Sequence, residues 1–264
     1  KPQAENIFTF DAATKPKLVN FDYESTILKE MKFEKSADDL LYQMANDKAV
    51  LGRRWAMGEL EKRSNDGSKP EIVAALINSA EKDPFWRIRR AALSVIANLY
   101  SPDPPPGQAR PAAKLDVHVE AAVMRLTKDT KPLIRADAIE LLGETQDRKY
   151  SPIFFAALDD RSYTVIDEAA RALGKVKEPK AVEPLSKLAV TSSWRGRIAI
   201  AGLTGLAILA DKRAFDLGLK LANDTTQLPS VRTAAAALVG AAGKGDARAF
   251  PLVFDRFKKA YESG

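Results

Sequence analysis

The sequence predicts an all-α solenoid of about six stacked helical pairs with a closing helix, preceded by a short β segment. Three observations carry this prediction. One set of residue types recurs in the same order along the chain at intervals of 31 to 46 residues, a period typical of stacked helical repeats. Within each copy the apolar residues follow the period of an amphipathic helix, and turn-forming residues separate the copies.

Four columns define the repeat. The first is acidic or threonine and holds Asp47, Asp83, Asp129, Asp160, Thr191 and Thr226. Six residues later, an arginine column holds Arg53, Arg89, Arg135, Ile166, Arg197 and Arg232. Three residues further on, a small-residue column holds Ala56, Ala92, Ala138, Ala169, Ile200 and Ala235. Four residues after that, an apolar column holds Leu60, Ile96, Leu142, Leu173, Thr204 and Val239.

Each column has a physical role. The aspartate or threonine can accept hydrogen bonds from free N–H groups where the second helix of a pair begins. The small residue lets a neighbouring helix approach, and the apolar residue lies on the same helical face. Glycine comes next in the last four copies, where we expect it to end the helix in the left-handed conformation; these residues are Gly143, Gly174, Gly205 and Gly240. Ile166 interrupts the arginine column, so we expect the arrangement of acidic residues and arginines beside Asp160 to be either broken or bridged by another cation such as Arg161.

Residues 1–35 differ in composition from the repeats. The runs Asn6–Phe10, Lys17–Asp22 and Ile27–Phe33 resemble strands and are separated by turn-forming residues. We therefore expect two or three short strands here. Two strands alone are marginal in water, so they should lean on the first helices or on another domain.

From Ser36 onward the helical period dominates through residue 264. The predicted first helices of the pairs, with the closing helix last, are Ala37–Ala45, Pro70–Glu81, Asp116–Thr127, Ser151–Leu158, Pro179–Val190, Lys212–Ala222 and Asp246–Ala260. The predicted second helices are Val50–Arg63, Phe85–Leu99, Pro132–Gly143, Tyr163–Gly174, Trp194–Ala210 and Pro229–Ala241.

The segment Ser101–Lys114 interrupts this pattern. It contains five prolines and a glycine, which exclude a regular helix. We interpret residues 101–114 as an exposed insertion between two pairs that has little to bury. A proline-rich recognition ligand at Pro102–Pro105 is the alternative.

The order of aspartate, arginine, alanine and leucine-glycine resembles the second helix of HEAT-like repeats. The resemblance extends over about residues 36–260. It implies an α-α superhelix, similar in architecture to armadillo-like arrays, in which the aspartate and arginine columns face one another as a ladder inside the stack. It implies no particular function, because such arrays serve many.

The composition narrows the function classes. Without cysteine and with one histidine, His118, the chain cannot form a paired-histidine zinc site or a cysteine nucleophile, and it has no HExxH motif. We expect no catalytic residue, metal site or cofactor. No apolar run reaches the roughly 18 residues of a membrane span, and there is no signal-peptide pattern. We expect a soluble protein of the bacterial cytoplasm or cell envelope.

Basic residues lie beside tryptophan near the starts of several predicted second helices. The candidate partner-binding residues are Trp55, Trp86, Arg87, Arg90, Trp194 and Arg195. Aromatic and basic residues together can bind nucleic acid, as in HEAT-like DNA glycosylases. The favoured interpretation is structural, with one arginine per copy in the internal ladder and tryptophan packing between copies. The net charge of +6 permits an acidic partner without requiring one.

Residues around 17–60 resemble a second family, the bacterial zinc aminopeptidases of the aminopeptidase-N-like gluzincin type, at the junction between a β-sandwich and a helical-repeat tail. The matching residues are Phe21, Asp22, Ile27, Leu28, Lys29, Glu30, Phe33, Lys35, Ser36, Leu41, Asp47, Val50, Leu51, Gly52, Arg53, Ala56 and Leu60. The family's catalytic motifs have no counterpart here. The resemblance therefore implies a non-catalytic C-terminal region of a longer protein, with residues 1–35 as the end of an upstream β-sandwich.

The function expected from the sequence is a non-enzymatic scaffold that binds a protein, either an upstream catalytic domain of the same polypeptide or a separate partner. In an aminopeptidase-like parent, the array could pack on the catalytic domain and restrict access to its cleft. A free-standing HEAT-like adaptor and a nucleic-acid-binding HEAT-like protein are the alternatives. Ligand, oligomeric state and compartment stay open.

Overall fold

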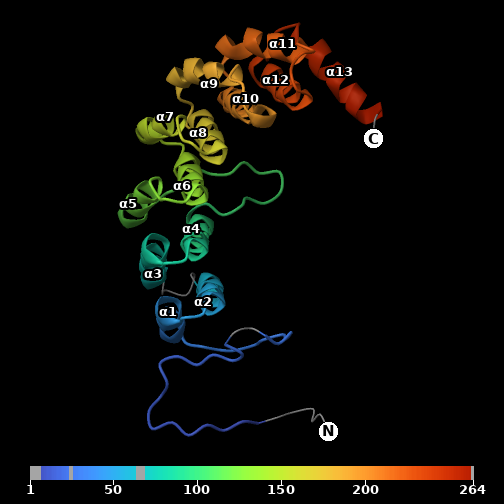
Figure 1. The fold of residues 1–264 in the computed structure, drawn as a ribbon. Helices are drawn as coiled ribbons and strands as arrows, with labels where there is room; N and C mark the ends of the chain where they lie inside the picture. Colours follow the sequence, from blue (N-terminus) through green and yellow to red (C-terminus); the bar gives the residue numbers. More distant parts are fainter. Residues whose placement is uncertain (1–6, 24–25, 64–68, 263–264) are drawn as a thin grey trace.

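The computed structural model describes residues 7–23, 26–63 and 69–262. Helices of these residues stack into an elongated array, in which the first helices of the pairs form one layer and the second helices form the other (Figure 1). The first helices are α1 (Ala37–Asn46), α3 (Lys69–Lys82), α5 (Val117–Leu126), α7 (Ser151–Ala157), α9 (Val182–Ala189) and α11 (Phe215–Asn223). The second helices are α2 (Val50–Lys62), α4 (Trp86–Tyr100), α6 (Pro132–Glu144), α8 (Tyr163–Lys175), α10 (Arg197–Leu209) and α12 (Pro229–Ala242), followed by α13 (Ala249–Glu262).

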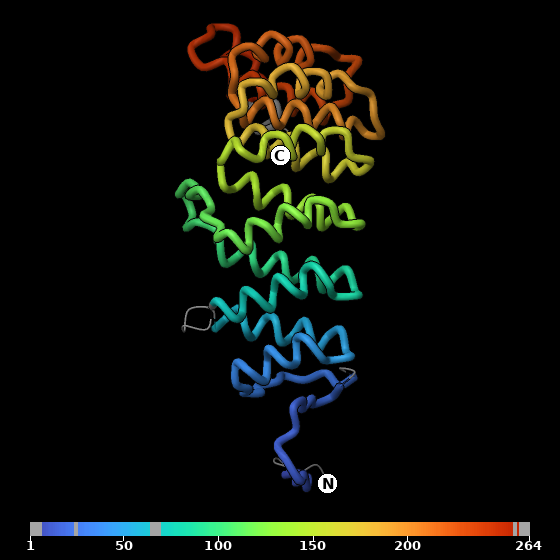
Figure 2. The backbone as a smooth tube through the Cα atoms, turned by 90° about the vertical axis from the view of Figure 1, so that its left-hand side faces the viewer, coloured from blue at the N-terminus to red at the C-terminus, as the bar shows by residue number. Residues whose placement is uncertain are grey.

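The predicted solenoid of six pairs and a closing helix is confirmed. The array bends toward the side of the second helices, which we call the inner face (Figure 1). Turns within the pairs lie along one edge and connections between pairs along the other, as Figure 2 shows. Short 3-10 turns precede α7, α9, α10 and α11; they are Arg148–Tyr150, Pro179–Ala181, Trp194–Gly196 and Lys212–Ala214.

The repeat columns form the core between the layers. All five alanines of the small-residue column are fully buried, as the pattern predicts; they are Ala56, Ala92, Ala138, Ala169 and Ala235. In the apolar column, Leu60, Ile96, Leu142, Leu173 and Val239 are also fully buried. One continuous core therefore runs through the stack from α1 to α12.

The glycine column does not end the helices, so that prediction is wrong. Gly143, Gly174, Gly205 and Gly240 lie within α6, α8, α10 and α12, and none has a positive φ. Left-handed residues near helix ends are instead Gln146, Lys177 and Ala210, with φ of 55°, 53° and 57°. Gly143, Gly174 and Gly205 instead allow close helix packing, whereas a Cβ on Gly240 would make only ordinary contact.

The predicted strands are also wrong for the described residues. Residues 7–23 and 26–35 are extended or bent but form no strand ladder; Asn6 lies outside the described residues. The backbone bonds locally instead, since Asp22 adopts φ 51° and its carboxylate accepts from the N–H groups of Thr26 and Ile27. A strand needs a partner edge, and none faces this segment.

The insertion at 101–114 forms no helix, as predicted, but it is anchored at both ends. The Arg110 guanidinium donates to the Ser101 carbonyl at 2.8 Å, and the Ala113 N–H donates to the Glu144 carbonyl at 2.8 Å. Ser101 and Ala113 are each 8% exposed. The segment between these anchors stands out from the edge that carries the connections between pairs (Figure 2).

Across the part of the chain that the structure describes, no helix is both long enough and apolar enough to cross a bilayer.

Candidate protein-binding surfaces

Arginine and aspartate from neighbouring pairs meet in three paired hydrogen-bonded rungs. The Arg53 guanidinium bonds both carboxylate oxygens of Asp83, at 2.7 and 3.1 Å. Arg89 bonds Asp129 at 3.0 Å through two nitrogens, and Arg135 bonds Asp160 at 2.9 and 2.7 Å. The first rung is the most buried, with side-chain exposures of 10% for Arg53 and 5% for Asp83.

Each arginine pairs with the aspartate of the next repeat rather than its own. To its own repeat it donates a third hydrogen bond, as Arg135 does to the Asp129 carbonyl at 2.9 Å. Each aspartate also accepts the backbone N–H two residues on, as Asp129 does from Lys131. Burial alone would raise the pKa of the Asp129 carboxyl, but the bonds from Arg89 and the Lys131 N–H outweigh it and lower the pKa.

This offset explains the gap at Ile166. Asp160 already pairs with Arg135, so it needs no substitute cation. Of the two expected outcomes, the ladder is broken at Ile166 rather than bridged by Arg161, which makes only a smaller electrostatic contribution at Asp160. By the same offset, an arginine at position 166 would pair with the first-column residue of the next repeat, which is Thr191 and has no carboxylate. The arginine and its partner are absent together, and the ladder ends there without leaving a buried charge.

Arg197 and Arg232 form no rungs, contrary to the repeat-wide ladder expected from the columns. Arg197 is exposed, and the next repeat offers Thr226 rather than an aspartate. Arg232 donates only a long bond to the Ala222 carbonyl at 3.4 Å. The nearby Asp224 is used within its own turn, where it accepts from the N–H and hydroxyl of Thr226.

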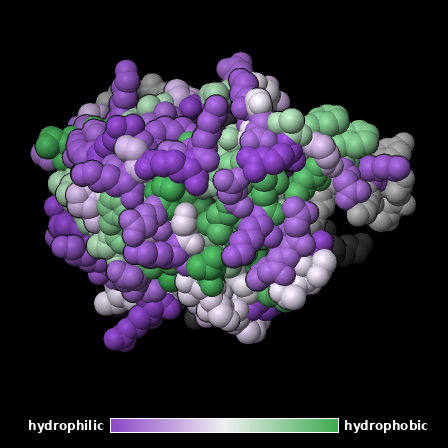
Figure 3. Space-filling model, turned by 90° about the horizontal axis from the view of Figure 1, so that it is seen from above, coloured by the Kyte–Doolittle hydropathy of each residue, from purple (hydrophilic) through white to green (hydrophobic). Residues whose placement is uncertain are grey.

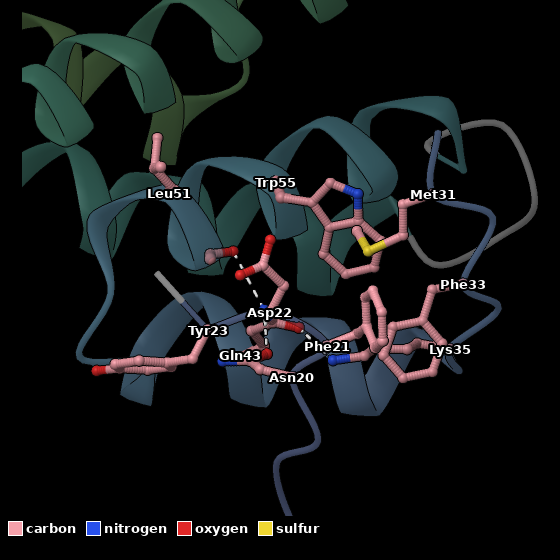
Figure 4. Close-up of a pocket in the computed structure, with 11 residues that line it drawn as sticks. Asn20, Phe21, Asp22, Tyr23, Met31, Phe33, Lys35, Gln43, Leu51 and Trp55 are labelled. Carbon is pink, nitrogen blue, oxygen red and sulfur yellow. Dashed lines mark hydrogen bonds between the residues drawn. The ribbon is translucent and has the colours of Figure 1, made fainter. Parts of the chain in front are cut away.

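At the other end of the ladder, the extended N-terminal segment replaces the missing arginine. Asp47 is 2% exposed, and its carboxylate accepts from the side-chain amides of Asn20 at 2.8 Å and Gln43 at 3.0 Å. Gln43 in turn accepts from Lys35 and donates to the Asn20 side chain. Asn20, Lys35 and Gln43 converge at the start of the stack (Figure 4). The segment therefore caps the first pair.

The same segment covers Trp55, which is one of the candidate partner-binding residues. The Phe33 ring stacks on Trp55 with ring centroids 6.3 Å apart, and the Lys35 ammonium lies 5.4 Å from the Trp55 ring (Figure 4). Trp55 is half-buried. Its face is thus occupied by the chain itself.

Four other candidates lie at the turns within pairs. Trp86 is half-buried with the Arg87 guanidinium 5.3 Å from its ring, and Trp194 is 65% exposed with Arg195 5.2 Å from its ring. Both arginines are exposed. Arg90 does not join them, because it pairs with Asp137 on α6 at 2.6 Å.

The inner face of α6 and α8 carries five carboxylates, which sequence reasoning missed: Asp137, Glu140, Glu144, Asp167 and Glu168. Three have cationic partners, namely Asp137 with Arg90, Glu144 with Lys175, and Asp167 with Arg171. Among the described residues, Glu140 and Glu168 form no ion pair, although Arg90 lies within electrostatic range of Glu140, and Arg171 and Lys175 within range of Glu168. Burial raises the pKa of Glu168 to about 7, and repulsion from Glu140 and Asp167 adds to the shift.

A polar cavity of about 280 Å³ adjoins this cluster, between α4, α6 and the insertion. Charged residues in its lining are Arg90, Asp103, Arg110, Asp137, Glu140 and Glu144. The insertion thus extends the inner face beyond the second helices. A partner lying over α6 would contact residues from both.

The described residues show no comparable cluster of side chains for catalysis or metal binding. His118 lies exposed at the start of α5, and no group of three or more His, Asp or Glu side chains within the described ranges could hold a metal ion.

The C-terminal end of the array shows apolar surface between hydrophilic side chains (Figure 3). On α13, Phe250, Val253 and Phe254 are exposed.

Comparisons with known proteins support the repeat fold. The family of HEAT repeats matches residues 119–204. Among curated proteins, none matches. The chain is similar in structure to a designed armadillo repeat protein in complex with peptide (KR)4, at 17% identity over 77% of this chain and 98% of that chain, with a TM-score of 0.52. It is also similar to an engineered protein, at 15% identity over 80% of this chain and 98% of that chain, with a TM-score of 0.53.

A third structure, the complex of CpcE and CpcF of phycocyanin lyase from Nostoc sp. PCC7120, matches at 15% identity over 86% of this chain and 96% of that chain, with a TM-score of only 0.40. Residues 119–204 thus match the HEAT-repeat family, and the two likenesses with TM-scores of 0.52 and 0.53 show a helical-repeat solenoid fold for the chain.

Proposed function

We propose that the chain is a non-catalytic scaffold that binds a protein partner on its inner face, where a basic segment of the partner lies over α6 and α8. The observation that carries this proposal is the two carboxylates on this face that form no ion pair among the described residues, Glu140 and Glu168. A group whose pKa is raised to about 7 by burial and repulsion gains from an added cation, because the cation favours its ionised form.

The charge distribution supports this choice of surface. The whole chain carries +6, yet α6 and α8 together contain five carboxylates against three basic residues, one of which, Arg135, is held in the ladder. A basic segment would be attracted to the carboxylates of α6 and α8 and repelled by the rest of the positively charged chain, which favours binding of the partner in one orientation. The armadillo-like neighbour that holds (KR)4 supports the choice of that peptide as a probe.

The proposal is tested with fluorescein-labelled (KR)4 and the complete 264-residue chain. We expect saturable binding in fluorescence anisotropy that weakens about tenfold when Glu140→Gln and Glu168→Gln are combined. The matched control combines Glu71→Gln and Glu183→Gln, which removes two exposed carboxylates from α3 and α9. The control should bind within about twofold of the parent chain. Equal weakening in both double variants would show attraction to net charge alone and would remove the proposal.

The pH dependence gives a second readout. Because the pKa of Glu168 is about 7, binding of (KR)4 should tighten between pH 6 and pH 8 as this carboxyl ionises. The peptide keeps its charge throughout this range. In the Glu168→Gln variant the change should be smaller.

A finer proposal concerns the protein to which the array belongs. The resemblance over residues 17–60 supports the C-terminal region of a zinc aminopeptidase-like protein, in which the segment capping α1 and α2 would connect to a preceding domain. The sequence of the complete gene tests it. An HExxH motif upstream of Lys1 would support this origin, and a free-standing adaptor follows if the gene encodes none.

The absence of catalysis is part of the proposal. The purified chain should contain no stoichiometric zinc and should not hydrolyse an aminoacyl anilide, because its one histidine stands alone on α5. Turnover that follows the protein through purification would contradict this.

A further inference from the structure

The turns within the helix pairs form a second exposed surface, which we call the turn edge. It comprises residues 47–51, 83–87, 127–132, 158–163, 190–195 and 224–228. These turns succeed one another along a single edge of the array, opposite the edge that carries the insertion (Figure 2). The turn edge is therefore a linear surface that repeats once per pair, and it is distinct from the cluster on the inner face.

A large apolar side chain is exposed in five of the six turns. These residues and their exposures are Leu51 (56%), Phe85 (37%), Tyr163 (38%), Trp194 (65%) and Leu228 (48%). The remaining turn presents exposed Pro132. Single exposed apolar residues are ordinary on a protein surface, but these stand two to four positions after the first column in successive turns, which gives a row of contacts.

An exposed cation accompanies them in five turns. These are Lys48, Arg87, Lys131, Arg161 and Arg195, none of which forms an ion pair with another described residue. Two of the guanidiniums lie over tryptophan rings, Arg87 on Trp86 and Arg195 on Trp194, and so are held in place at the surface.

The ladder explains why these turns are electropositive. Asp83, Asp129 and Asp160 are neutralised by the arginines of the preceding pairs, and Asp47 bonds Asn20 and Gln43. The carboxylates of the turns are thus turned inward, while the turn cations stay outside. Asp159 and Asp224 are exceptions, since Asp159 is exposed and Asp224 accepts only from Thr226 and Gln227, in a turn that has no cation.

We infer that the turn edge binds an acidic, extended protein segment in which carboxylates alternate with apolar side chains. Packed helices lie about 8–10 Å apart, so the turn edge presents roughly one cation per 10 Å. An extended peptide advances about 3.3 Å per residue, which brings every third residue opposite a new turn. Each strand of a B-form duplex carries a phosphate about every 3.4 Å of helix axis, a charge density about three times that of the turn edge. Leu51 and Leu228 also offer no ring for a base to stack on. Spacing and side-chain chemistry both favour the acidic peptide.

The test uses the complete chain and a fluorescein-labelled peptide of four Glu-Glu-Leu units, whose period matches that of the turns. We expect saturable binding that weakens about tenfold or more when Arg87→Glu and Arg195→Glu are combined. The matched control combines Lys114→Glu and Lys244→Glu, two exposed lysines in the connections on the opposite edge. It changes the net charge equally and should leave affinity within about twofold.

Two further ligands separate the contribution of the apolar contacts from that of charge alone. A peptide of four Glu-Glu-Ser units should bind more weakly, because it lacks the apolar contacts. A 12-nucleotide single strand should bind more weakly than the Glu-Glu-Leu peptide. Absence of saturable peptide binding, equal losses in the two double variants, or tighter binding of the single strand would each overturn the inference.

Folding of the variants is checked by thermal melting followed by circular dichroism. If Arg87→Glu with Arg195→Glu fails to fold, Lys131→Glu with Arg161→Glu tests the same surface. The outcome is independent of the function proposed for the inner face, because (KR)4 binding should not weaken in these variants. Loss of acidic-peptide binding alone concerns the turn edge, and loss of (KR)4 binding alone concerns α6 and α8.

Discussion

Neighbouring pairs from α1 to α8 are joined by buried or half-buried rungs of arginine and aspartate, whereas the second helices from α6 to α10 touch through glycine and alanine. A Cβ added to Gly174 would lie 2.7 Å from the Gly205 carbonyl oxygen, and one added to Gly205 would lie 2.6 Å from the Ala170 carbonyl oxygen. In α2, by contrast, a Cβ on Gly58 would meet nothing within 4 Å.

The two regions show that one repeat pattern can be stabilised in two ways. A rung joins adjacent turns at the edge of the stack and depends on hydrogen bonds and charge. A glycine contact joins helix backbones in the middle of the stack and depends on shape. The ladder stops at Ile166 and Thr191, where the close contact of α8 with α10 takes over. The predictions below separate the two mechanisms by the size and type of effect.

The largest effect is expected for Gly205→Val. The added side chain would overlap the α8 backbone at Ala170, which cannot move without displacing the helix, so the free energy of unfolding should fall by about 3–4 kcal/mol. Urea unfolding at equilibrium measures this. Gly58→Ala is the control, and it should stabilise by up to about 1 kcal/mol because alanine is the better helix former. A Gly205→Val chain as stable as the parent would show that α8 and α10 are not in close contact.

The next largest effect is expected in the ladder, for Arg53→Ala. This change leaves Asp83 buried without its cation, so stability should fall by about 2–4 kcal/mol. Arg135→Ala should cost less, about 1–2 kcal/mol, because its rung is more exposed, at 19% and 17% for Arg135 and Asp160. Thermal and urea unfolding of both variants give the order. The reverse order would mean that burial does not set the strength of a rung.

The helix pairs could be predicted from the sequence because each column acts within one helix. The positions of Ala56, Ala138 and Leu142 follow from the helical period alone, and the structure places them in the core. The pairing of Arg135 could not be predicted in the same way. Asp129 precedes it by six residues and Asp160 follows it by twenty-five, and only the packing of adjacent pairs decides between them.

The candidate surfaces were predicted less completely. Trp194 is 65% exposed, so the favoured interpretation that it packs between copies is wrong for this residue. Trp55 is covered by Phe33, a contact that could not be predicted because it depends on the path of the N-terminal segment. Glu140 and Glu168 resemble ordinary solvated helix residues in the sequence. Their importance appears only when α6 and α8 bring them within electrostatic range.

A third prediction transfers a rung from the first region into the second. Ile166→Arg alone should destabilise the chain, because it places a cation at a site that is only 5% exposed. Thr191→Asp supplies the aspartate that this repeat lacks. We expect the double variant to be more stable than the sum of the single changes by about 1 kcal/mol or more, measured as a double-mutant cycle in urea. Strict additivity would mean that the α9–α10 turn, with Arg195 at φ 54°, holds position 191 too far away.

The smallest effect is expected at Glu168, where the carboxylate is destabilised rather than held by a rung. Its pKa is about 7 in the folded chain and lies near 4.3 in unfolded peptides, so folding binds a proton between these values. The protonated Glu168 carboxyl therefore contributes fully to the free energy of unfolding below about pH 4.3, and this contribution is lost as the pH rises through 7.

The Glu168→Gln variant has no carboxyl to ionise and so does not lose stability in this way. After allowance for solvent screening, the variant should be about 1 kcal/mol more stable than the parent at pH 8 and equal to it at pH 4. Glu183→Gln, at a carboxylate whose side chain is 80% exposed, is the control and should change neither value. An equal gain for Glu168→Gln at both pH values would assign the effect to helix propensity rather than charge. A gain confined to high pH would mean that α6 and α8 keep an unfavourable pair of carboxylates at some cost in stability, as expected of a surface that receives its cations from a partner.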